Sequence, residues 1–214
     1  MDGGPAQAAA RLSAMLETSR LRLLCHAATA AVRTSAFPAD EPIDAEARQK
    51  LASPPFRLSR AERCWTSPAL RALQTAQALQ LDAVVEPMLR DCDYGRWAGR
   101  SFDEVQSEEP DAIAAWLRDP ACAPHGGESI LALIERAAAW LDRESGTPGR
   151  ILAVTHAAFI RAAIVHAIDA PPHSFWRIDI APLSLIRLSG ARGRWTLASI
   201  ARAEATDSHD DAQS

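Results

Sequence analysis

The sequence has few cysteines, and they are widely spaced. Cys25, Cys64, Cys92 and Cys122 form no C-x-x-C pair and have no matched histidines. This excludes the usual zinc-site spacings and is not the pattern of a disulfide framework. Unpaired cysteines of this kind are typical of the reducing cytoplasm, so we expect a cytoplasmic protein that holds no metal.

The sequence also lacks an excess of positive charge and a long hydrophobic run. It has 23 Lys and Arg residues against 27 Asp and Glu, a net charge of −4. Near the N-terminus, Asp2 stands where a signal peptide carries positive charge, and Arg11 interrupts the apolar part. We therefore expect no secretory signal, no membrane partner and no nucleic-acid partner. Attraction for an anionic substrate must come from a few arginines in a local pocket.

The composition is that of an ordinary globular domain. The 214 residues are 48% hydrophobic and 23% charged, which suits one sizeable core. There is no internal repeat and no domain linker. We expect an N-terminal extension over residues 1–19, one domain over 20–203, and a polar, acidic, disordered tail over 204–214.

Apolar runs alternate with helical patterns along the domain. The runs predict buried strands at Leu21–Cys25, 62–67, 84–85 and 151–155. Helices are predicted at 44–52, 68–80, 102–107, 111–117, from the GGES stretch to about Arg143, and after His156 to Ile168. Residues 175–200 predict further strands, with turns at 181–182 and 190–193. This order predicts an α/β fold, a three-layer sandwich whose mostly parallel central sheet is flanked by helices.

Two of the predicted strands run directly into a histidine. The segment RLRLLC precedes His26, and ILAVT precedes His156. In an open parallel sheet, ligands bind at the carboxyl ends of the strands. The small neighbours Ala27 and Ala157 leave room for a ligand beside the rings. We expect the two histidines to lie side by side at a ligand site.

An arginine is predicted near the same edge of the sheet. The stretch SPALRALQTA places Arg71 about one turn into a helix that starts at a strand end. Backbone N–H groups and a guanidinium in that position suit an anion such as phosphate. We expect Arg71 to face the same cleft as the histidines.

Five ordered motifs over about residues 20–200 resemble the histidine phosphatase superfamily, also called phosphoglycerate-mutase-like. The Arg-His-Gly motif of that family is matched by Cys25-His26-Ala27, with Thr29 three residues after the histidine. The other four matches are SPALRALQTA (67–76), LRDCDYGRWAG (89–99) with Asp91 at the acidic position, GGES (126–129), and VTHAA (154–158) around His156.

The resemblance implies a phosphoryl-transfer site without a metal or cofactor. His26 would attack phosphorus and form a phosphohistidine that water then hydrolyses. Arg71 and His156 would hold the phosphoryl oxygens, and Thr29 would join the phosphate-binding set. Asp91 would protonate the leaving alkoxide and then deprotonate the water. The implied partner is a small phosphorylated metabolite, with homodimer formation left open.

Some positions depart from the family pattern. Cys25 replaces an arginine that clamps the phosphate, and losing such a donor costs about 3–4 kcal/mol of transition-state stabilisation. Arg33, seven residues after His26, is the candidate to reach back into the pocket. Ala27 replaces a glycine, and Asp91 replaces the commoner glutamate. The alternative function is therefore a member with weak or lost catalysis that binds a phosphorylated ligand.

Other functions fit less well. A cysteine-dependent phosphatase needs C-x5-R, but seven residues separate Cys25 from Arg33. A phosphoglycerate mutase usually has a longer insertion, whereas the short 91–126 segment resembles smaller phosphatases, including alpha-ribazole phosphatase-like and fructose-2,6-bisphosphatase-like members. Segments 34–41 and 100–125 are expected to contact the substrate. Trp97 and Trp116 are expected either to stack on it or to pack in the core.

Overall fold

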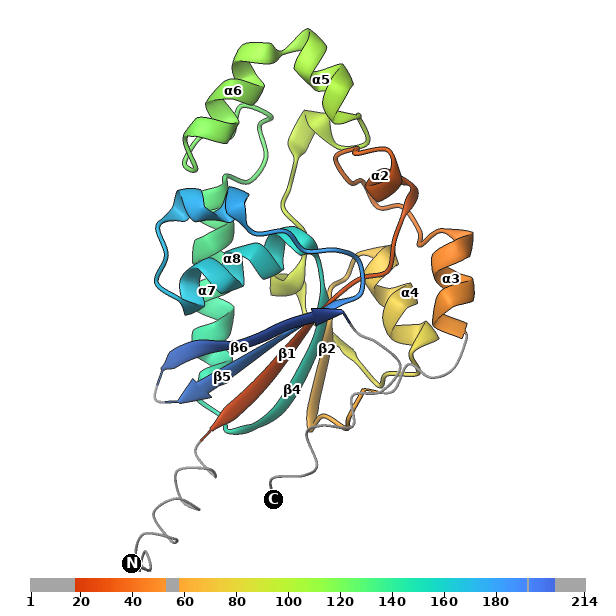
Figure 1. Ribbon diagram of the computed structural model, residues 1–214, viewed down its shortest axis with the longest axis vertical. Coiled ribbons are helices and arrows are strands. Elements are labelled where there is room, and N and C mark those ends of the chain that lie inside the picture. The colour runs from red at the N-terminus through yellow and green to blue at the C-terminus, as the bar shows by residue number, and fades with distance from the viewer. Residues whose placement is uncertain (1–17, 53–57, 192, 203–214) are drawn as a thin grey trace, which may run out of the picture.

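The computed structural model describes residues 18–52, 58–191 and 193–202 (Figure 1). The fold runs from β1 (Ser19–Cys25) to β6 (Arg194–Arg202). The acidic tail and nearly all of the expected N-terminal extension lie outside the described residues. Within the described ranges, no helix is long and apolar enough to cross a membrane.

The centre of the fold is a six-stranded sheet in the order β3-β2-β4-β1-β5-β6. Strands β1, β2 (Arg63–Thr66), β3 (Val84–Val85) and β4 (Gly149–Thr155) are parallel, whereas β5 (Ser184–Ala191) and β6 run antiparallel to their neighbours. Cys25 pairs with Thr155, and Thr66 pairs with Val154. The carboxyl ends of β1, β2 and β4 therefore meet at one edge, and the predicted sheet is confirmed.

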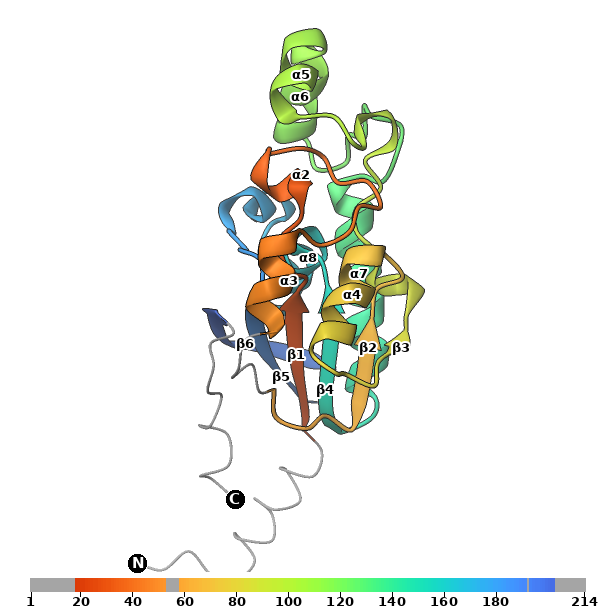
Figure 2. The ribbon, with the colours of Figure 1, turned by 90° about the vertical axis from the view of Figure 1, so that its right-hand side faces the viewer.

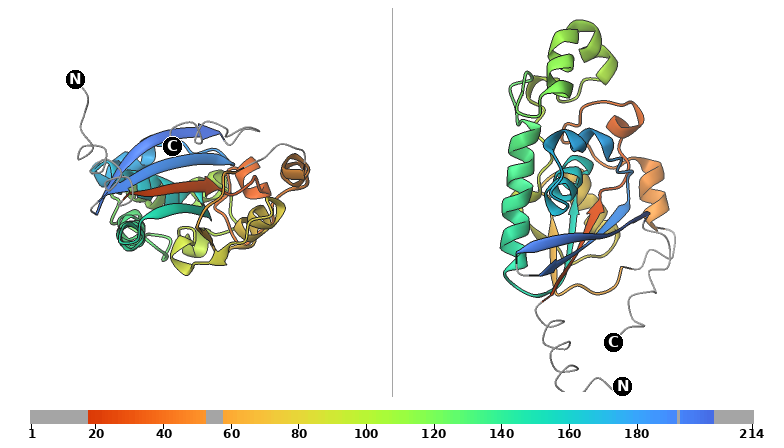
Figure 3. Two further views of the ribbon diagram at one scale, coloured as in Figure 1. Left: turned by 90° about the horizontal axis from the view of Figure 1, so that it is seen from below. Right: turned by 60° about the vertical axis from the view of Figure 1, so that its left-hand side comes forward.

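Helices cover both faces of this sheet. Leu24 and Leu152 point to the face covered by α4 (Leu70–Ala78), and α3 (Ala45–Ala52) packs beside α4. Figure 2 shows α3 and α4 in front of the strands. The opposite face is covered by α7 (Ile130–Ser145) and α8 (Ala157–Ala167), and the right-hand view of Figure 3 shows α7 along the side of the molecule. The three-layer prediction is confirmed.

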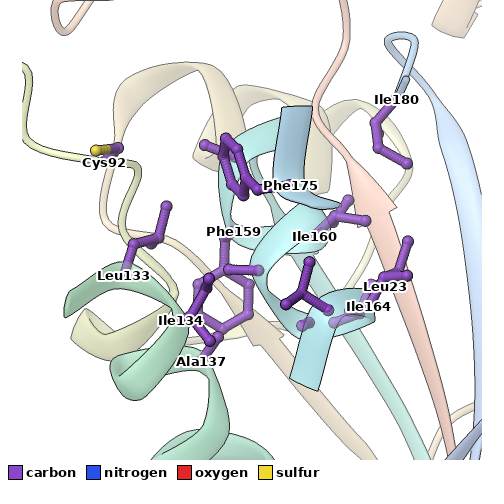
Figure 4. Packing of buried hydrophobic residues seen from close by; sticks show 14 of the residues in the cluster. Leu23, Cys92, Leu133, Ile134, Ala137, Phe159, Ile160, Ile164, Phe175 and Ile180 are labelled. Atoms are coloured by element: carbon purple, nitrogen blue, oxygen red, sulfur yellow. The ribbon is translucent and has the colours of Figure 1, made fainter. Parts of the chain in front are cut away.

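The larger hydrophobic core lies between the sheet and these two helices. Leu23 of β1 lies near Ile160 and Ile164 of α8, while Phe159 lies against Ile134 of α7 (Figure 4). All five side chains are buried. Burying a side chain of this size contributes about 1.5–3 kcal/mol, so this packing fixes α8, and with it His156, on the sheet.

Two short helices, α5 (Phe102–Glu108) and α6 (Pro110–Arg118), extend beyond the carboxyl edge of the sheet (Figure 1). An aromatic cluster includes residues of both helices, Phe102 of α5 and Trp116 of α6. The Phe37 ring centroid is 5.2 Å from that of Trp97, in the 3-10 helix η2 (Gly95–Trp97), and 5.7 Å from that of Trp116. Both tryptophans are buried, which confirms core packing for them.

The C-terminal third differs from the prediction at one place. Residues 172–177 form a 3-10 helix, η3 (Pro172–Arg177), and the first C-terminal strand starts only at Ser184. The strand expected at 175–180 is therefore wrong. Pro171 and Pro172 have no N–H to donate to a sheet, and a proline suits the first turn of a helix. The turn at 190–193 is confirmed as the β5–β6 hairpin, in which Ala191 pairs with Arg194.

Three short elements beside the site have no counterpart in the prediction. These are α2 (Ala30–Arg33) and the 3-10 helices η1 (Pro87–Leu89) and η2 (Gly95–Trp97). Each is only a turn long, below the length at which hydrophobic periodicity can be recognised.

Candidate active site

The two histidines that end β1 and β4 lie side by side. Their ring centroids are 5.1 Å apart. The parallel pairing of Cys25 with Thr155 places them there, because each histidine is the next residue along its strand. His26 is 5% exposed and His156 is fully buried. The structure thus brings together the two residues that the sequence analysis selected.

The ring of His26 is held in one orientation. Its Nδ1 lies 2.7 Å from the carbonyl oxygen of Ala27, and the N–H of Ala27 donates to Oγ1 of Thr75 at 3.0 Å. Leu183, in the left-handed region with φ of 61°, directs its N–H toward the carbonyls of Cys25 and His26. A carbonyl accepts only, so Nδ1 carries the proton and Nε2 keeps its lone pair.

Arg71 of α4 connects this histidine to a carboxylate. Its Nε donates to Nε2 of His26 at 3.3 Å, and its Nη2 donates to Oδ2 of Asp91 at 2.6 Å. Its Nη1 donates to the carbonyl of Ala39 at 2.6 Å and lies 3.9 Å from Oε1 of Glu41. The side chain is only 2% exposed. Arg71 therefore faces His26 and Asp91 from the helix that follows β2.

His156 contacts two other members of the site. Its Nε2 lies 2.7 Å from Oγ of Ser67, and its Nδ1 lies 3.4 Å from Oδ2 of Asp91. Ser67 is the first residue after β2, at the same edge as the histidines. Ser67 belongs to the SPALRALQTA motif (67–76), but the motif alone predicted no role for it. Its position directly after a predicted strand was the available signal.

Asp91 lies on the loop between η1 and η2, where other residues hold it. Its Oδ1 accepts the N–H of Cys92 at 2.9 Å. Arg136 of α7 donates to the carbonyl oxygens of Met88, Arg90 and Asp91 at 2.6, 2.9 and 3.1 Å. One guanidinium thus holds the loop, which keeps the carboxyl group at the site.

The GGES stretch (126–129) also holds the loop that carries Asp91. Glu128 donates its N–H to the carbonyl of Asp93 at 2.8 Å, and its side chain pairs with Arg136 at 2.6 Å. A Cβ at Gly127 would lie 2.1 Å from the Asp93 carbonyl oxygen. Glycine is therefore required for this close approach, so GGES positions Asp91 indirectly.

Burial determines the protonation of the two histidines. Burial, assisted by the charge of Arg71, lowers the pKa of His26 from its ordinary 6.5 to about 4. Burial also lowers the pKa of His156 well below its usual value. Both rings are therefore neutral near pH 7, and Nε2 of His26 has a lone pair, which accepts from Nε of Arg71 at 3.3 Å.

The pKa of the Asp91 carboxyl group is lowered, whereas the pKa of the Cys25 thiol is raised. Burial alone would raise the pKa of Asp91, but His156 and Arg71 outweigh it, so the pKa is lowered. Burial, and then the charge of Asp91, raises the pKa of Cys25 to about 12. A protonated, buried thiol is not a nucleophile at neutral pH, which disfavours the cysteine-dependent mechanism.

Two of the expected phosphate ligands have other contacts. Arg33 pairs through Nε with Asp44 at 2.5 Å and through Nη2 with Glu46 at 2.9 Å, and its side chain is 47% exposed. The structure therefore does not bring Arg33 to the side of His26, because α2 carries it toward α3. Thr29 caps α2, and its Oγ1 accepts the N–H of Val32 at 3.4 Å. That contact uses an acceptor lone pair of the hydroxyl group and does not use its proton.

Across the part of the chain that the structure describes, no group of three or more His, Cys, Asp or Glu residues could hold a metal ion. Arg71, the two uncharged histidines and Asp91 form a largely buried cluster with a lone-pair nitrogen on His26, one guanidinium and one carboxyl group, and a second carboxyl group, that of Glu41, lies 3.9 Å from Arg71. These groups can accept a phosphoryl group and move one proton.

Known proteins share both the sequence pattern and the fold. The histidine phosphatase superfamily (branch 1) matches residues 21–202. A bifunctional protein of Mycobacterium tuberculosis is 34% identical over 131 residues, which cover 56% of this chain and 35% of that protein. Phosphoserine phosphatase 1 of Hydrogenobacter thermophilus is 27% identical over 128 residues, which cover 58% of this chain and 61% of the relative.

Among solved structures, a putative alpha-ribazole-5'-P phosphatase of Escherichia coli superimposes with a TM-score of 0.75 at 24% identity. The match covers 88% of this chain and 99% of that one, and it supports the fold. The chain spans about 35% and 61% of the lengths of the two relatives, whereas the family match extends over nearly the whole described domain. The chain therefore belongs to the histidine phosphatase superfamily.

Proposed function

We propose that this protein is a metal-independent phosphomonoesterase that acts on a small phosphorylated metabolite through a phosphohistidine at His26. One observation carries the proposal. Nδ1 of His26 is fixed on the Ala27 carbonyl, so Nε2 presents its lone pair beside Arg71 and His156. An oriented, neutral imidazole next to a guanidinium is what attack on a phosphate ester requires.

In the first step, Nε2 of His26 forms a bond to phosphorus while the bond from phosphorus to the leaving oxygen breaks. Arg71 and Nδ1–H of His156 hold the nonbridging oxygens, where the charge lies during transfer. Asp91 gives its proton to the leaving alkoxide. In the second step, water attacks phosphorus, Asp91 takes the proton of that water, and the N–P bond breaks.

For these two steps to proceed, substrate binding must cause the carboxyl group of Asp91 to become protonated. In the free protein, Arg71 donates to Asp91 at 2.6 Å and contributes to the lowered pKa of the carboxyl group. A bound phosphate dianion attracts Arg71 and places negative charge beside Asp91. Both effects raise the pKa of Asp91, so the acid becomes protonated when the substrate is in place.

The leaving group of the substrate belongs beside the aromatic cluster. Phe37 lies two residues before Ala39, whose carbonyl accepts from Arg71, and its ring centroid is 5.3 Å from that of Tyr94. Because Tyr94 is partly exposed while Trp97 is buried, Tyr94 is the ring available to a ligand. A phosphomonoester with an apolar or ring-bearing leaving group, such as an alpha-ribazole phosphate, fits this environment. The four free cysteines suit a cytoplasmic enzyme.

The proposal is tested by assaying purified full-length protein against a panel of phosphomonoesters in the presence of a metal chelator. The panel includes phosphoserine, phosphorylated three-carbon acids, a ribazole phosphate and p-nitrophenyl phosphate. We expect phosphate release that the chelator leaves unchanged and that His26→Ala abolishes. Binding of phosphate esters without turnover would instead identify a non-catalytic phosphate-binding protein.

A further inference from the structure

The catalytic pocket has little positive charge for a phosphate ester. Arg71 is 2.6 Å from Asp91 and 3.9 Å from Glu41, so two carboxylates already surround its charge. His26 and His156 are neutral near pH 7 because burial lowers the pKa of each. A phosphate ester carries up to about two negative charges at that pH. A second cation near the pocket is therefore needed for tight binding.

Arg161 belongs to α8, the helix whose N-terminal end meets the site. His156 is the N-cap of α8, and Arg161 is one turn after Ala157, on the same helix face. Side chains on a helix point back toward its N-terminus, so Arg161 extends toward the ends of β1 and β4. The N–H of Ala157 and the charge of Arg161 both act on Cys25.

Tyr94 provides a second reference point for the position of Arg161. The pKa of Tyr94 is raised by burial and then by Asp91, and the charges of Arg161 and Arg71 oppose that rise. Cys25 responds to the same three charged groups. Arg161 therefore lies within electrostatic range of both Cys25 and Tyr94, as Arg71 and Asp91 do.

The guanidinium of Arg161 has unused hydrogen-bonding capacity. Its Cζ lies 5.7 Å from the centroid of the Phe175 ring, and Nη2 lies 3.7 Å from Oδ1 of Asp179, which is 97% exposed. Exposed pairs of this kind contribute little. Its Nε is buried and has no hydrogen-bond partner among the described residues. Buried donors normally have a partner, so a ligand group is the natural complement.

The other arginine near His156 is fully engaged. Arg136 donates to Glu128 at 2.8 and 2.6 Å and to three backbone carbonyls of the loop that carries Asp91. It cannot turn to a substrate without releasing that loop. Arg161 has no such structural task.

We propose that Arg161 is a second phosphate-binding residue, which leaves Asp179 when the substrate binds and donates to a nonbridging oxygen of the phosphoryl group from the Cys25 side of His26. This inference rests on the proposed function. Arg161 supplies the positive charge that Cys25 cannot supply, and it takes the role in phosphate binding that was expected of Arg33.

The test measures binding of orthovanadate and of inorganic phosphate to the full-length protein by calorimetry, together with kcat/KM. Arg161→Met keeps an apolar stem against Phe175, so the variant should fold. We expect the Kd for both anions to rise ten- to hundredfold, the order of a lost charged hydrogen bond, and kcat/KM to fall about a hundredfold. Arg161→Lys keeps the charge but loses the planar fork, and should lose less.

Two control variants accompany it. Arg33→Ala removes an arginine that is paired with Asp44 and Glu46, and should stay within about twofold of wild type. Asp179→Ala frees Arg161 from its partner and should not weaken anion binding.

Cys25→Arg should recover more activity in the Arg161→Met background than it adds to wild type, because the two arginines would share one task.

Wild-type anion affinity in Arg161→Met would overturn the inference. A wild-type protein that binds vanadate but hydrolyses no ester would refute the proposed function alone, since anion binding still reports on Arg161. A wild-type protein that binds neither anion would refute both.

Discussion

Oγ of Ser67 lies 2.7 Å from Nε2 of His156. The same oxygen accepts the N–H of Ala69 at 3.2 Å, and Ser67 has one hydroxyl proton to donate. Nδ1 of His156 faces Oδ2 of Asp91 at 3.4 Å, and a carboxylate only accepts, so the ring proton lies on Nδ1 and Nε2 accepts the hydroxyl proton of Ser67. Asp91 and Ser67 together therefore favour the tautomer in which His156 has a donor on the side of Asp91.

Ser67→Ala tests this positioning task. We expect kcat to fall about tenfold or more, because an unheld ring spends less time with Nδ1–H directed at the phosphoryl group. KM should change less than kcat. Ser101→Ala removes a hydroxyl that caps α5 and should change only the thermal midpoint. Equal kinetics for Ser67→Ala and wild type would show that Ser67 only fills space.

The pKa of His26 predicts where activity is lost in acid. Only the neutral ring can attack phosphorus, and its pKa is lowered to about 4. We expect kcat/KM to hold from neutral pH down to about pH 5 and to fall as the pH drops through about 4. A pH-rate profile with a stable buffer series measures this. An acid limb near the ordinary histidine value of 6.5 would contradict the burial of the nucleophile.

The same shift predicts a loss of stability in acid. The pKa of His26 is lower in the folded chain than its ordinary 6.5, so the unfolded chain takes up the proton first. Stability is full above about pH 6.5 and is lost as the pH falls toward 4. Protonation of His26 should lower the free energy of unfolding by about 2 kcal/mol at pH 5 relative to pH 7. Urea unfolding at both pH values should show a smaller loss for His26→Asn, and an equal loss would exclude His26 as its source.

Asp91→Asn separates the two proton transfers. An alkyl phosphate needs a proton on its leaving oxygen, so its hydrolysis should fall about 10²–10⁴-fold. p-Nitrophenyl phosphate has a good leaving group, so its first step should survive while attack of water on the phosphohistidine is slowed. Rapid mixing should then show a burst of p-nitrophenol. Equal losses for both substrates without a burst would assign the proton transfer to another group.

Gly127→Ala tests the support of the Asp91 loop. The added Cβ would lie 2.1 Å from the Asp93 carbonyl oxygen, and backbone cannot give way cheaply. We expect a loss of about 1–3 kcal/mol in the free energy of unfolding, together with lower kcat. Gly146→Ala is the matched control, because its Cβ would meet only the Arg143 carbonyl oxygen at 3.5 Å in a right-handed conformation. Matching effects of the two variants would argue against a loop-specific role.

The parts of the site that could be predicted are those that local patterns in the sequence mark. Apolar runs that end in His26 and His156, with a helix carrying Arg71 between them, are local patterns, and parallel pairing brings their ends together. Arg33 is different, because the carboxylates of Asp44 and Glu46 that hold it become neighbours only after folding. Its position on the chain near His26 was no guide to its position in space.

The missed residues share the same cause. Thr75 holds the Ala27 N–H, and Ser67 orients His156 across 89 positions of sequence. Arg161, the second phosphate ligand proposed above, lies within a hydrophobic helical stretch, where periodicity predicts the helix but not what its side chains contact. Contacts between segments that are far apart in the sequence leave no periodic pattern, so the structure had to show them.

The most direct test of the central claim is to trap the phosphoryl group on the protein. Protein mixed with radiolabelled substrate and quenched within milliseconds should carry phosphate that is labile in acid and stable in base, and Asp91→Asn should increase its amount. His26→Ala should carry none, whereas Cys25→Ser should carry the wild-type amount. Label that persists in His26→Ala, or that disappears in Cys25→Ser, would contradict transfer through His26.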